Sequence, residues 1–233
     1  GPNSALNTIM AEQRCRFADA LEQADDFEAT LQQIVCRALS EHKRVIFDGN
    51  GYSEEWKQEA ARRGLSNYPS TAEAQPAYVS EKNIDLVVRH GIFNETEFRA
   101  RYFIHLESYR KVVNIEARTM LDMAIHQILP AASAYAKDLC DAAVAKRELG
   151  APCRSELDLI SKLSETQDAL YARLCQLTGE LKAIPEDAKA AAEYCRNVVI
   201  ASMDDIRRSA DRLEELTAKK YWPFPTYSDM LFY

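Results

Sequence analysis

Histidine is the side chain most often used as a general base or metal ligand near neutral pH. The chain has four of them, His42, His90, His105 and His126. Asp122 and His126 stand four residues apart, so on a helix they would share one face, as two metal ligands do. The same spacing is typical of a simple pair on a helix surface, and we favour that interpretation. No Glu-x-x-His occurs, which excludes a di-iron helical bundle.

A second candidate is the segment from Asp48 to Glu59, which begins Asp-Gly-Asn-Gly like a calcium-binding loop. Such a loop needs an oxygen ligand at its fifth position and Gly at its sixth. Tyr52 and Ser53 occupy these positions. We therefore predict a tight turn here and no calcium site.

Carboxylates on a predicted long helix are the third candidate. Glu107, Glu116 and His126 could line a polar pocket in a ligand-binding bundle. Arginine and lysine flank the two glutamates, and charged residues on long helices usually form a solvated face, so we favour structural ion pairs. The sequence also contains no G-x-x-x-x-G-K-[ST], G-x-G-x-x-G or G-x-S-x-G motif. We therefore assign no catalytic, cofactor-binding or metal-binding residue to this chain.

The six cysteines form no C-x-x-C pair, and most occupy apolar positions of helical patterns. This pattern predicts buried free thiols in a reducing cytoplasm. A reactive thiol is considered only at Cys153, which follows Pro152 in a predicted loop.

Bulk composition excludes several classes of function. The formal net charge of −7 argues against a nucleic-acid-binding surface. No run of about 18 apolar residues is present, so we expect no membrane span and a cytoplasmic protein. The chain starts at Gly1 and not at Met, and we expect that its natural N-terminus is missing.

Apolar periodicity predicts an all-α protein. We expect helices over residues 4–23, 26–42, 53–64, 80–90 and 94–149, with an extended piece and turn at 44–51 and an irregular connection at 65–79. The stripes of the first two helices consist of Leu6, Ile9, Met10, Phe17 and Leu21, and of Phe27, Leu31, Ile34, Val35 and Leu39. Pro130 is a possible kink in the longest helix.

Two heptad seams follow the break at residues 150–152. One seam runs from Ile160 to Leu181 and contains one polar residue, Gln167; the other runs from Ala192 to Leu213. Ile184-Pro185 separates them, with Pro185 suited to the first turn of the second helix. We predict a long antiparallel bundle containing a coiled-coil-like hairpin. The aromatic tail at 221–227 should dock on the body or on a neighbouring subunit.

Several stretches, taken in order, resemble the C-terminal portion of type III glutamine synthetases, the large-chain branch of that family. They are found at residues 3–12, 43–56, 59–67, 114–117, 128–131 and 222–227, and the stretch Lys43-Arg44-Val45-Ile46-Phe47-Asp48-Gly49-Asn50-Gly51-Tyr52-Ser53-Glu54-Glu55-Trp56 is the longest and most unusual. The resemblance is densest over 43–67 and thinnest over 150–215.

The resemblance implies that residues 1–42 are closing helices of a catalytic domain and that 43–233 is the helical extension typical of type III enzymes. The parent enzyme would join ammonia to glutamate using ATP with magnesium or manganese. The family's metal, ATP and glutamate ligands would lie upstream, so this segment would hold no cofactor. Its expected partners are the upstream catalytic domain and other copies of the chain in a ring assembly. The alternative is a free-standing helical protein-interaction module, motivated by the two seams.

Overall fold

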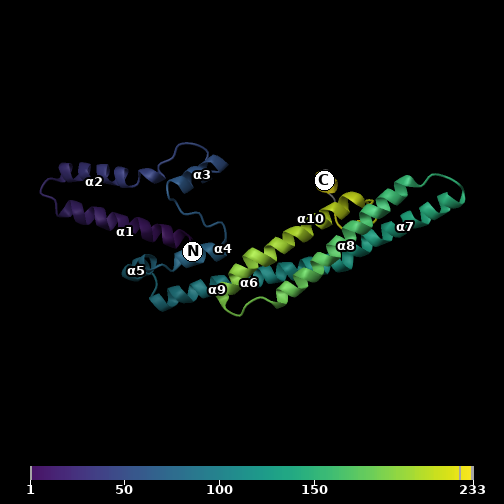
Figure 1. The fold of residues 1–233 in the computed structure, drawn as a ribbon. Helices are drawn as coiled ribbons and strands as arrows, with labels where there is room; N and C mark the ends of the chain where they lie inside the picture. The colour runs from purple at the N-terminus through teal and green to yellow at the C-terminus, as the bar shows by residue number, and fades with distance from the viewer. Residues whose placement is uncertain (1, 226, 232–233) are drawn as a thin grey trace. The chain divides into compact units, whose positions relative to one another are not determined.

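The computed structural model describes residues 2–225 and 227–231, and within these ranges every regular element is helical (Figure 1). The predicted all-α fold is therefore confirmed. The chain divides into two compact units, Gly1–Ile104 and His105–Tyr233. None of the described helices combines the length and the apolarity that crossing a membrane requires.

The first unit contains α1 (Pro2–Glu22), α2 (Phe27–Glu41), the short 3-10 helix η1 (Lys43–Val45), α3 (Glu54–Arg62), α4 (Thr71–Tyr78) and α5 (Glu81–Arg89). Polar caps begin several of these helices. Asp26 accepts from the backbone N–H of Ala29, and Ser53 accepts from that of Trp56. These caps satisfy N–H groups that have no partner inside the helix.

One prediction in this unit is wrong and a second holds only in part. The expected irregular connection at 65–79 contains α4, which Ser70 caps at the N–H of Glu73 and which contains Pro76. Proline removes only one N–H, so a short capped helix tolerates it close to its C-terminal end. The expected extended piece at 44–47 begins as the 3-10 turn η1, and only the residues after it are non-helical.

A small core holds the first unit together. Ile84, Val87 and Phe98 are buried, and the Phe98 ring lies 4.4 Å from that of Tyr78. An ionic contact joins α1 to α5, since the carboxylate of Glu12 accepts from Arg89 at 2.6 Å and lies 2.8 Å from His90 Nε2.

The helix α6 (Glu95–Met123) begins in the first unit and continues into the second. The second unit then contains η2 (Ala124–Ile128), α7 (Leu129–Glu148), α8 (Arg154–Lys182), α9 (Ala188–Tyr194), η3 (Cys195–Val199), α10 (Ile200–Leu216) and α11 (Tyr227–Leu231). α8 packs against α7 on one side and against α10 on the other (Figure 1). The predicted antiparallel hairpin of two seams is thus confirmed. Both seams contribute to its core, with Leu163, Leu170, Leu174 and Leu177 facing Cys195, Val199, Ile206 and Leu213.

Pro130 does not break the long helix. The turn before it, η2, is a π-helix in which the Leu129 N–H donates to the Ala124 carbonyl, five residues back. A proline ring clashes with the carbonyl four residues earlier in a regular helix, and a widened turn relieves this clash. The wider turn also keeps Ala124, Ile128 and Ala132, spaced four apart, on the buried face.

The second helix of the hairpin begins later than predicted. α9 starts at Ala188, and Asp187 caps it by accepting from the N–H of Ala190 at 2.8 Å. Pro185 lies in the preceding loop. A charged cap satisfies two needs, an unpaired N–H and the positive end of the helix dipole, so it sets the start of the helix more strongly than proline does.

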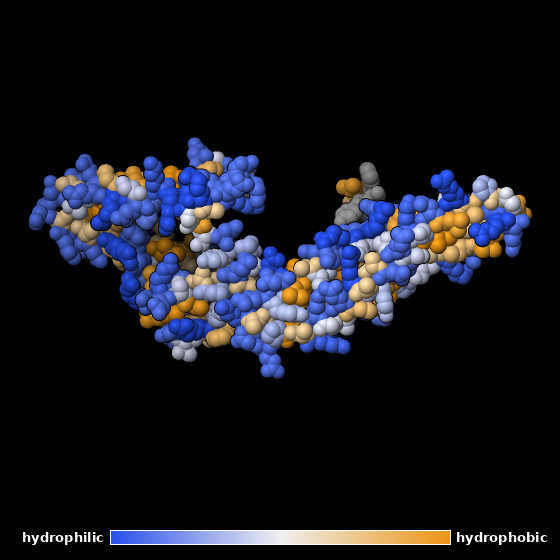
Figure 2. Space-filling model, in the orientation of Figure 1, coloured by the Kyte–Doolittle hydropathy of each residue, from blue (hydrophilic) through white to orange (hydrophobic). Residues whose placement is uncertain are grey.

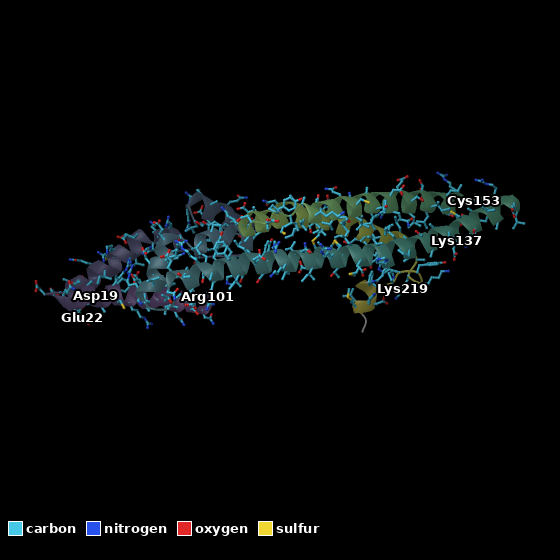
Figure 3. All side chains as sticks on the ribbon, turned by 90° about the horizontal axis from the view of Figure 1, so that it is seen from below. Asp19, Glu22, Arg101, Lys137, Cys153 and Lys219 are labelled. Carbon is cyan, nitrogen blue, oxygen red and sulfur yellow. The ribbon has the colours of Figure 1, made fainter. Side chains whose placement is uncertain are left out.

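The aromatic tail docks on its own chain. The rings of Tyr221 and Tyr135 lie 5.1 Å apart, the Tyr221 hydroxyl donates to Asp138, and Trp222 and Phe224 pack against the core. Lys219, labelled in Figure 3, forms an ion pair with Asp229 of α11. Thr226 and the side chain of Tyr227, also part of the predicted tail, lie outside what the structure describes.

Candidate functional site

Asp122 and His126 form an exposed pair, as we expected. Oδ1 of Asp122 lies 3.7 Å from Nε2 of His126, and their side chains are 68% and 70% exposed. Within the described residues, no three His, Cys, Asp or Glu side chains come close enough together to hold a metal ion.

The structure does not bring Glu107, Glu116 and His126 together in one pocket, although Glu116 lines the groove described below. The three residues lie along one continuous helix, so at 1.5 Å per residue they are separated by roughly 13 Å and 15 Å along its axis. Glu107 lies 2.9 Å from Arg110 and 3.9 Å from Lys111, the structural ion pairs that we favoured.

The Asp48–Gly51 segment is a turn, as predicted. The Asn50 side chain accepts from the N–H of Tyr52 at 3.0 Å, and the Asn50 carbonyl accepts from the N–H of Ser53. Glu59, the twelfth residue of the rejected calcium loop, binds two guanidinium groups instead. Hydrogen bonds from Arg62 and Arg63 lower the pKa of Glu59 from 4.5 to about 2.

Arg63 organises the loop before α3. Its guanidinium donates to the Ile46 carbonyl at 2.9 Å and lies 5.5 Å from the centre of the Trp56 ring. Trp56 stacks on Phe47 with 4.0 Å between ring centres. The stretch that carries the densest family resemblance therefore builds a structural node of stacked rings and ion pairs.

The prediction of buried cysteines is wrong for most of them. Cys15, Cys36, Cys140 and Cys175 are exposed, Cys153 is half-buried, and Cys195 is buried. Helical spacing identified the apolar side of each helix, but it could not show which of these sides pack against another helix. Cys153 lies at the turn between α7 and α8 and occupies the N-cap of α8 (Figure 3). Burial raises the pKa of the Cys195 thiol, which makes it less reactive.

A groove in the second unit lies between α6–η2 and α10, and residues of the tail contribute to its lining. It encloses about 610 Å³, which is within the range of ligand-binding cavities. The lining is mostly apolar, and Ala124, Ile128 and Ile206 contribute buried floor residues. Its other apolar members include Met120, Met123, Met203, Trp222, Phe224 and Met230. We call this feature the methionine groove.

Charged groups stand on the edge of the methionine groove. The lining contains three carboxylates, those of Glu116, Asp211 and Glu214, and one guanidinium, that of Arg207. Arg207 is already paired with Asp211 at 2.7 Å. The groove thus combines an apolar floor with an acidic rim. Sequence reasoning missed it, although four of the five methionines of the chain line it, which was the available signal.

The α1–α2 hairpin exposes much of the apolar stripe that we predicted for it. Leu6, Ile9 and Met10 on α1 are 61%, 52% and 55% exposed. Phe27, Val35 and Leu39 on α2 are similarly exposed, while the polar Thr8 is buried. Figure 2 shows orange apolar surface on this hairpin among the blue charged side chains. We call these six residues the hairpin face; a face of this kind usually marks a contact with another surface.

These features define an all-helical protein with two apolar surfaces suited to contact, the hairpin face and the methionine groove. Comparison with known proteins identifies the family. Residues 30–147, just over half of the chain, match the family model described as the glutamine synthetase C-terminal domain, and the chain belongs to that family. The resemblance noted from the sequence is therefore confirmed.

Curated relatives agree with this assignment. A glutamine synthetase of Butyrivibrio fibrisolvens is 37% identical over 212 residues, covering 89% of this chain and 30% of the relative. The type-3 glutamine synthetase of Dictyostelium discoideum is 30% identical, with 99% and 33% covered. A glutamine synthetase of Bacteroides fragilis (strain YCH46) is 31% identical, with 98% and 33% covered. The chain thus spans about a third of the length of the relatives it matches.

Proposed function

We propose that this chain is the C-terminal segment of a type III glutamine synthetase and serves that enzyme as a structural and subunit-assembly scaffold. Membership of the C-terminal domain family supports the first part. The relatives are about three times as long as this chain, which supports a role as part of a larger polypeptide. The proposed boundary at residue 42 between catalytic domain and extension rests on the resemblance alone.

The hairpin face is the observation that carries the scaffold role. Two helices whose apolar stripes would ordinarily be buried leave six large side chains in contact with water. At about 25 cal/mol per Å² of apolar area, covering such a surface is strongly favourable. We propose that the catalytic region of the parent enzyme covers the hairpin face, as expected for helices that close a domain.

The reaction belongs to the parent enzyme under this proposal. It would ligate ammonia to glutamate with ATP and magnesium or manganese, using residues upstream of this segment, while the segment alone would not catalyse. The assembled enzyme would be a cytoplasmic ring of identical chains, with bundle surfaces of the segment contributing to subunit contacts.

The proposal is tested first by activity. The 233-residue chain is mixed with glutamate, ammonia, ATP and magnesium, and phosphate release is compared with a protein-free control. We expect no difference, and turnover well above the control would refute the non-catalytic role.

The scaffold role needs a second test in a longer glutamine synthetase chain that ends in this segment. Leu6→Glu with Met10→Glu places charge on the hairpin face and should reduce both the assembled fraction and the activity, because buried unpaired charges are costly. Asp19→Asn with Glu22→Gln changes charge on the same helix, at positions that helical spacing places on another side from Leu6 and Met10, and serves as the control. Equal assembly of the two double variants in sedimentation velocity would contradict the role.

A free-standing interaction module remains the alternative function. The methionine groove favours it, because an apolar groove with a charged rim is suited to binding a partner. The length of the relatives favours the first proposal. Finding a carboxylate-rich catalytic region just before Asn3 in the parent reading frame would eliminate the alternative.

A further inference from the structure

Methionines converge on one place in this chain. Met120 and Met123 come from α6, Met203 from α10 and Met230 from α11, and all four line the methionine groove. Methionine side chains are unbranched and polarizable, so they adapt to the shape of a bound apolar group and are over-used at peptide-binding surfaces. The composition of the groove therefore favours an apolar partner segment.

The walls of the groove indicate the shape of that segment. On α10 the lining extends from Met203 to Glu214, eleven residues and thus about 16 Å at the helical rise. This is the length of three helical turns. Ile115 and Met123, on the opposite wall, are 64% and 36% exposed, so the groove is open to solvent along its side. An elongated apolar groove between two helices is suited to the apolar face of a third.

The rim indicates the charge of that segment. Three carboxylates and one guanidinium among the described lining residues leave a formal excess of two negative charges, and the guanidinium is already paired. An acidic rim attracts a basic partner and repels an acidic one.

We propose that the methionine groove is the docking site of a basic amphipathic helix from a partner protein. Apolar side chains at positions i, i+3, i+4 and i+7 of that helix would enter the groove between Met120 and Met203. Lysine or arginine on its flanks would meet Glu116 and Glu214. The inference does not depend on the scaffold role, because the groove lies within the second unit while the hairpin face belongs to the first.

Trp222 provides a built-in reporter for the test, because it lines the groove and the only other tryptophan is Trp56 in the first unit. In a Trp56→Phe background, the 233-residue chain is titrated with two synthetic helical peptides that share one leucine face. One carries lysine on its polar face and the other glutamate. We expect the lysine peptide to shift Trp222 emission and to bind at least about tenfold more tightly than the glutamate peptide.

Two variants separate charge from shape. Glu116→Gln with Glu214→Gln should reduce the preference for lysine to less than about threefold, because the excess rim charge is gone. Met203→Lys should abolish the emission change with both peptides while circular dichroism stays helical. The proposal would be overturned if neither peptide changed Trp222 emission, or if the chain with its rim unaltered bound both peptides equally. Full peptide binding by the Met203→Lys variant would also overturn it. So would a dimer in sedimentation that Met203→Lys dissociates, since a second copy would then occupy the groove.

Discussion

The side-chain amide of Gln167 on α8 donates a hydrogen bond of 2.8 Å to the hydroxyl of Ser133 on α7. Gln167 is the polar residue of an otherwise apolar seam. Gln167 is half-buried and Ser133 is exposed, so the pair lies at the edge of the seam. A polar pair between two helices favours one register over its neighbours, because sliding of the helices breaks the hydrogen bond. The pair therefore contributes to the alignment of α7 and α8.

Gln167→Ala should lower the free energy of unfolding by about 1 kcal/mol, because it removes this hydrogen bond and some packing. Urea denaturation followed by circular dichroism measures the change. Ser133→Ala and the double variant complete a cycle that isolates the pair. A double variant whose loss equals the sum of the single losses would contradict the role given to the pair.

The bundle was predictable from sequence because its seams meet each other. Leu163, Leu170 and Leu177 recur at heptad spacing, and each of them is fully buried in the structure. The same reasoning applied to Leu6 and Ile9 predicted a stripe that the described chain leaves exposed. Periodicity reports which side of a helix is apolar, whereas burial depends on what lies opposite, which a single helix pattern does not contain.

Neighbouring residues on α8 test the core assignment. Leu170 is fully buried and the adjacent Tyr171 is 62% exposed. Leu170→Ala should cost about 2–5 kcal/mol of unfolding free energy, since it removes buried apolar contacts and leaves a cavity. Tyr171→Ala, the matched control, should change it by less than about 0.5 kcal/mol. Similar losses at the two positions, measured by urea denaturation, would be incompatible with this packing.

Replacement of Gly150 and of Gly179 by alanine should change the stability of the protein in opposite directions. Gly150 ends α7 with φ of +68°, a conformation that costs a non-glycine residue, so Gly150→Ala should destabilise by about 1 kcal/mol. Gly179 lies inside α8, and the position that an alanine Cβ would take is open space, so Gly179→Ala should stabilise by about 0.5–1 kcal/mol. Thermal unfolding of both variants checks the signs, and a stabilised Gly150→Ala variant would refute the cap geometry.

The contacts of Glu59 with Arg62 and Arg63 should be lost at low pH. The folded-state pKa of Glu59 is about 2, below the ordinary 4.5, so its contacts are fully present above pH 4.5 and are lost as the pH falls toward 2. Arg63 links Glu59 to Trp56. In a Trp222→Phe background, Trp56 emission should therefore change with a midpoint well below pH 4.5.

Two variants identify the titrating group. Glu59→Gln should remove the acid transition. Glu55→Gln should preserve it, although the pKa of Glu55 is also lowered, by a hydrogen bond from its own backbone N–H and one from Ser53. A transition that survives in Glu59→Gln would show that another carboxylate is responsible.

The methionine groove shows why surfaces were harder to predict than elements. Met120 and Met203 stand 83 positions apart in the sequence, and each belongs to a different helical stripe. Within its own stripe each residue looks like an ordinary core position. Only the three-dimensional fold, in which α6, η2, α10 and the returning Trp222 line one groove, brings them together. By contrast, the turn at 48–51 and the helix starts near Asp26 and Ser53 were predicted, because their causes lie within three or four residues.

Hydrogen exchange of the α1–α2 hairpin tests the central claim most directly. Amide exchange over residues 2–41 is measured in the 233-residue chain and in a longer glutamine synthetase chain ending in this segment, with residues 163–177 of α8 as internal reference. If the catalytic region covers the hairpin face, exchange over 2–41 should slow by at least about tenfold in the longer chain, while α8 changes little. Equal exchange of the hairpin in both proteins would contradict the claim.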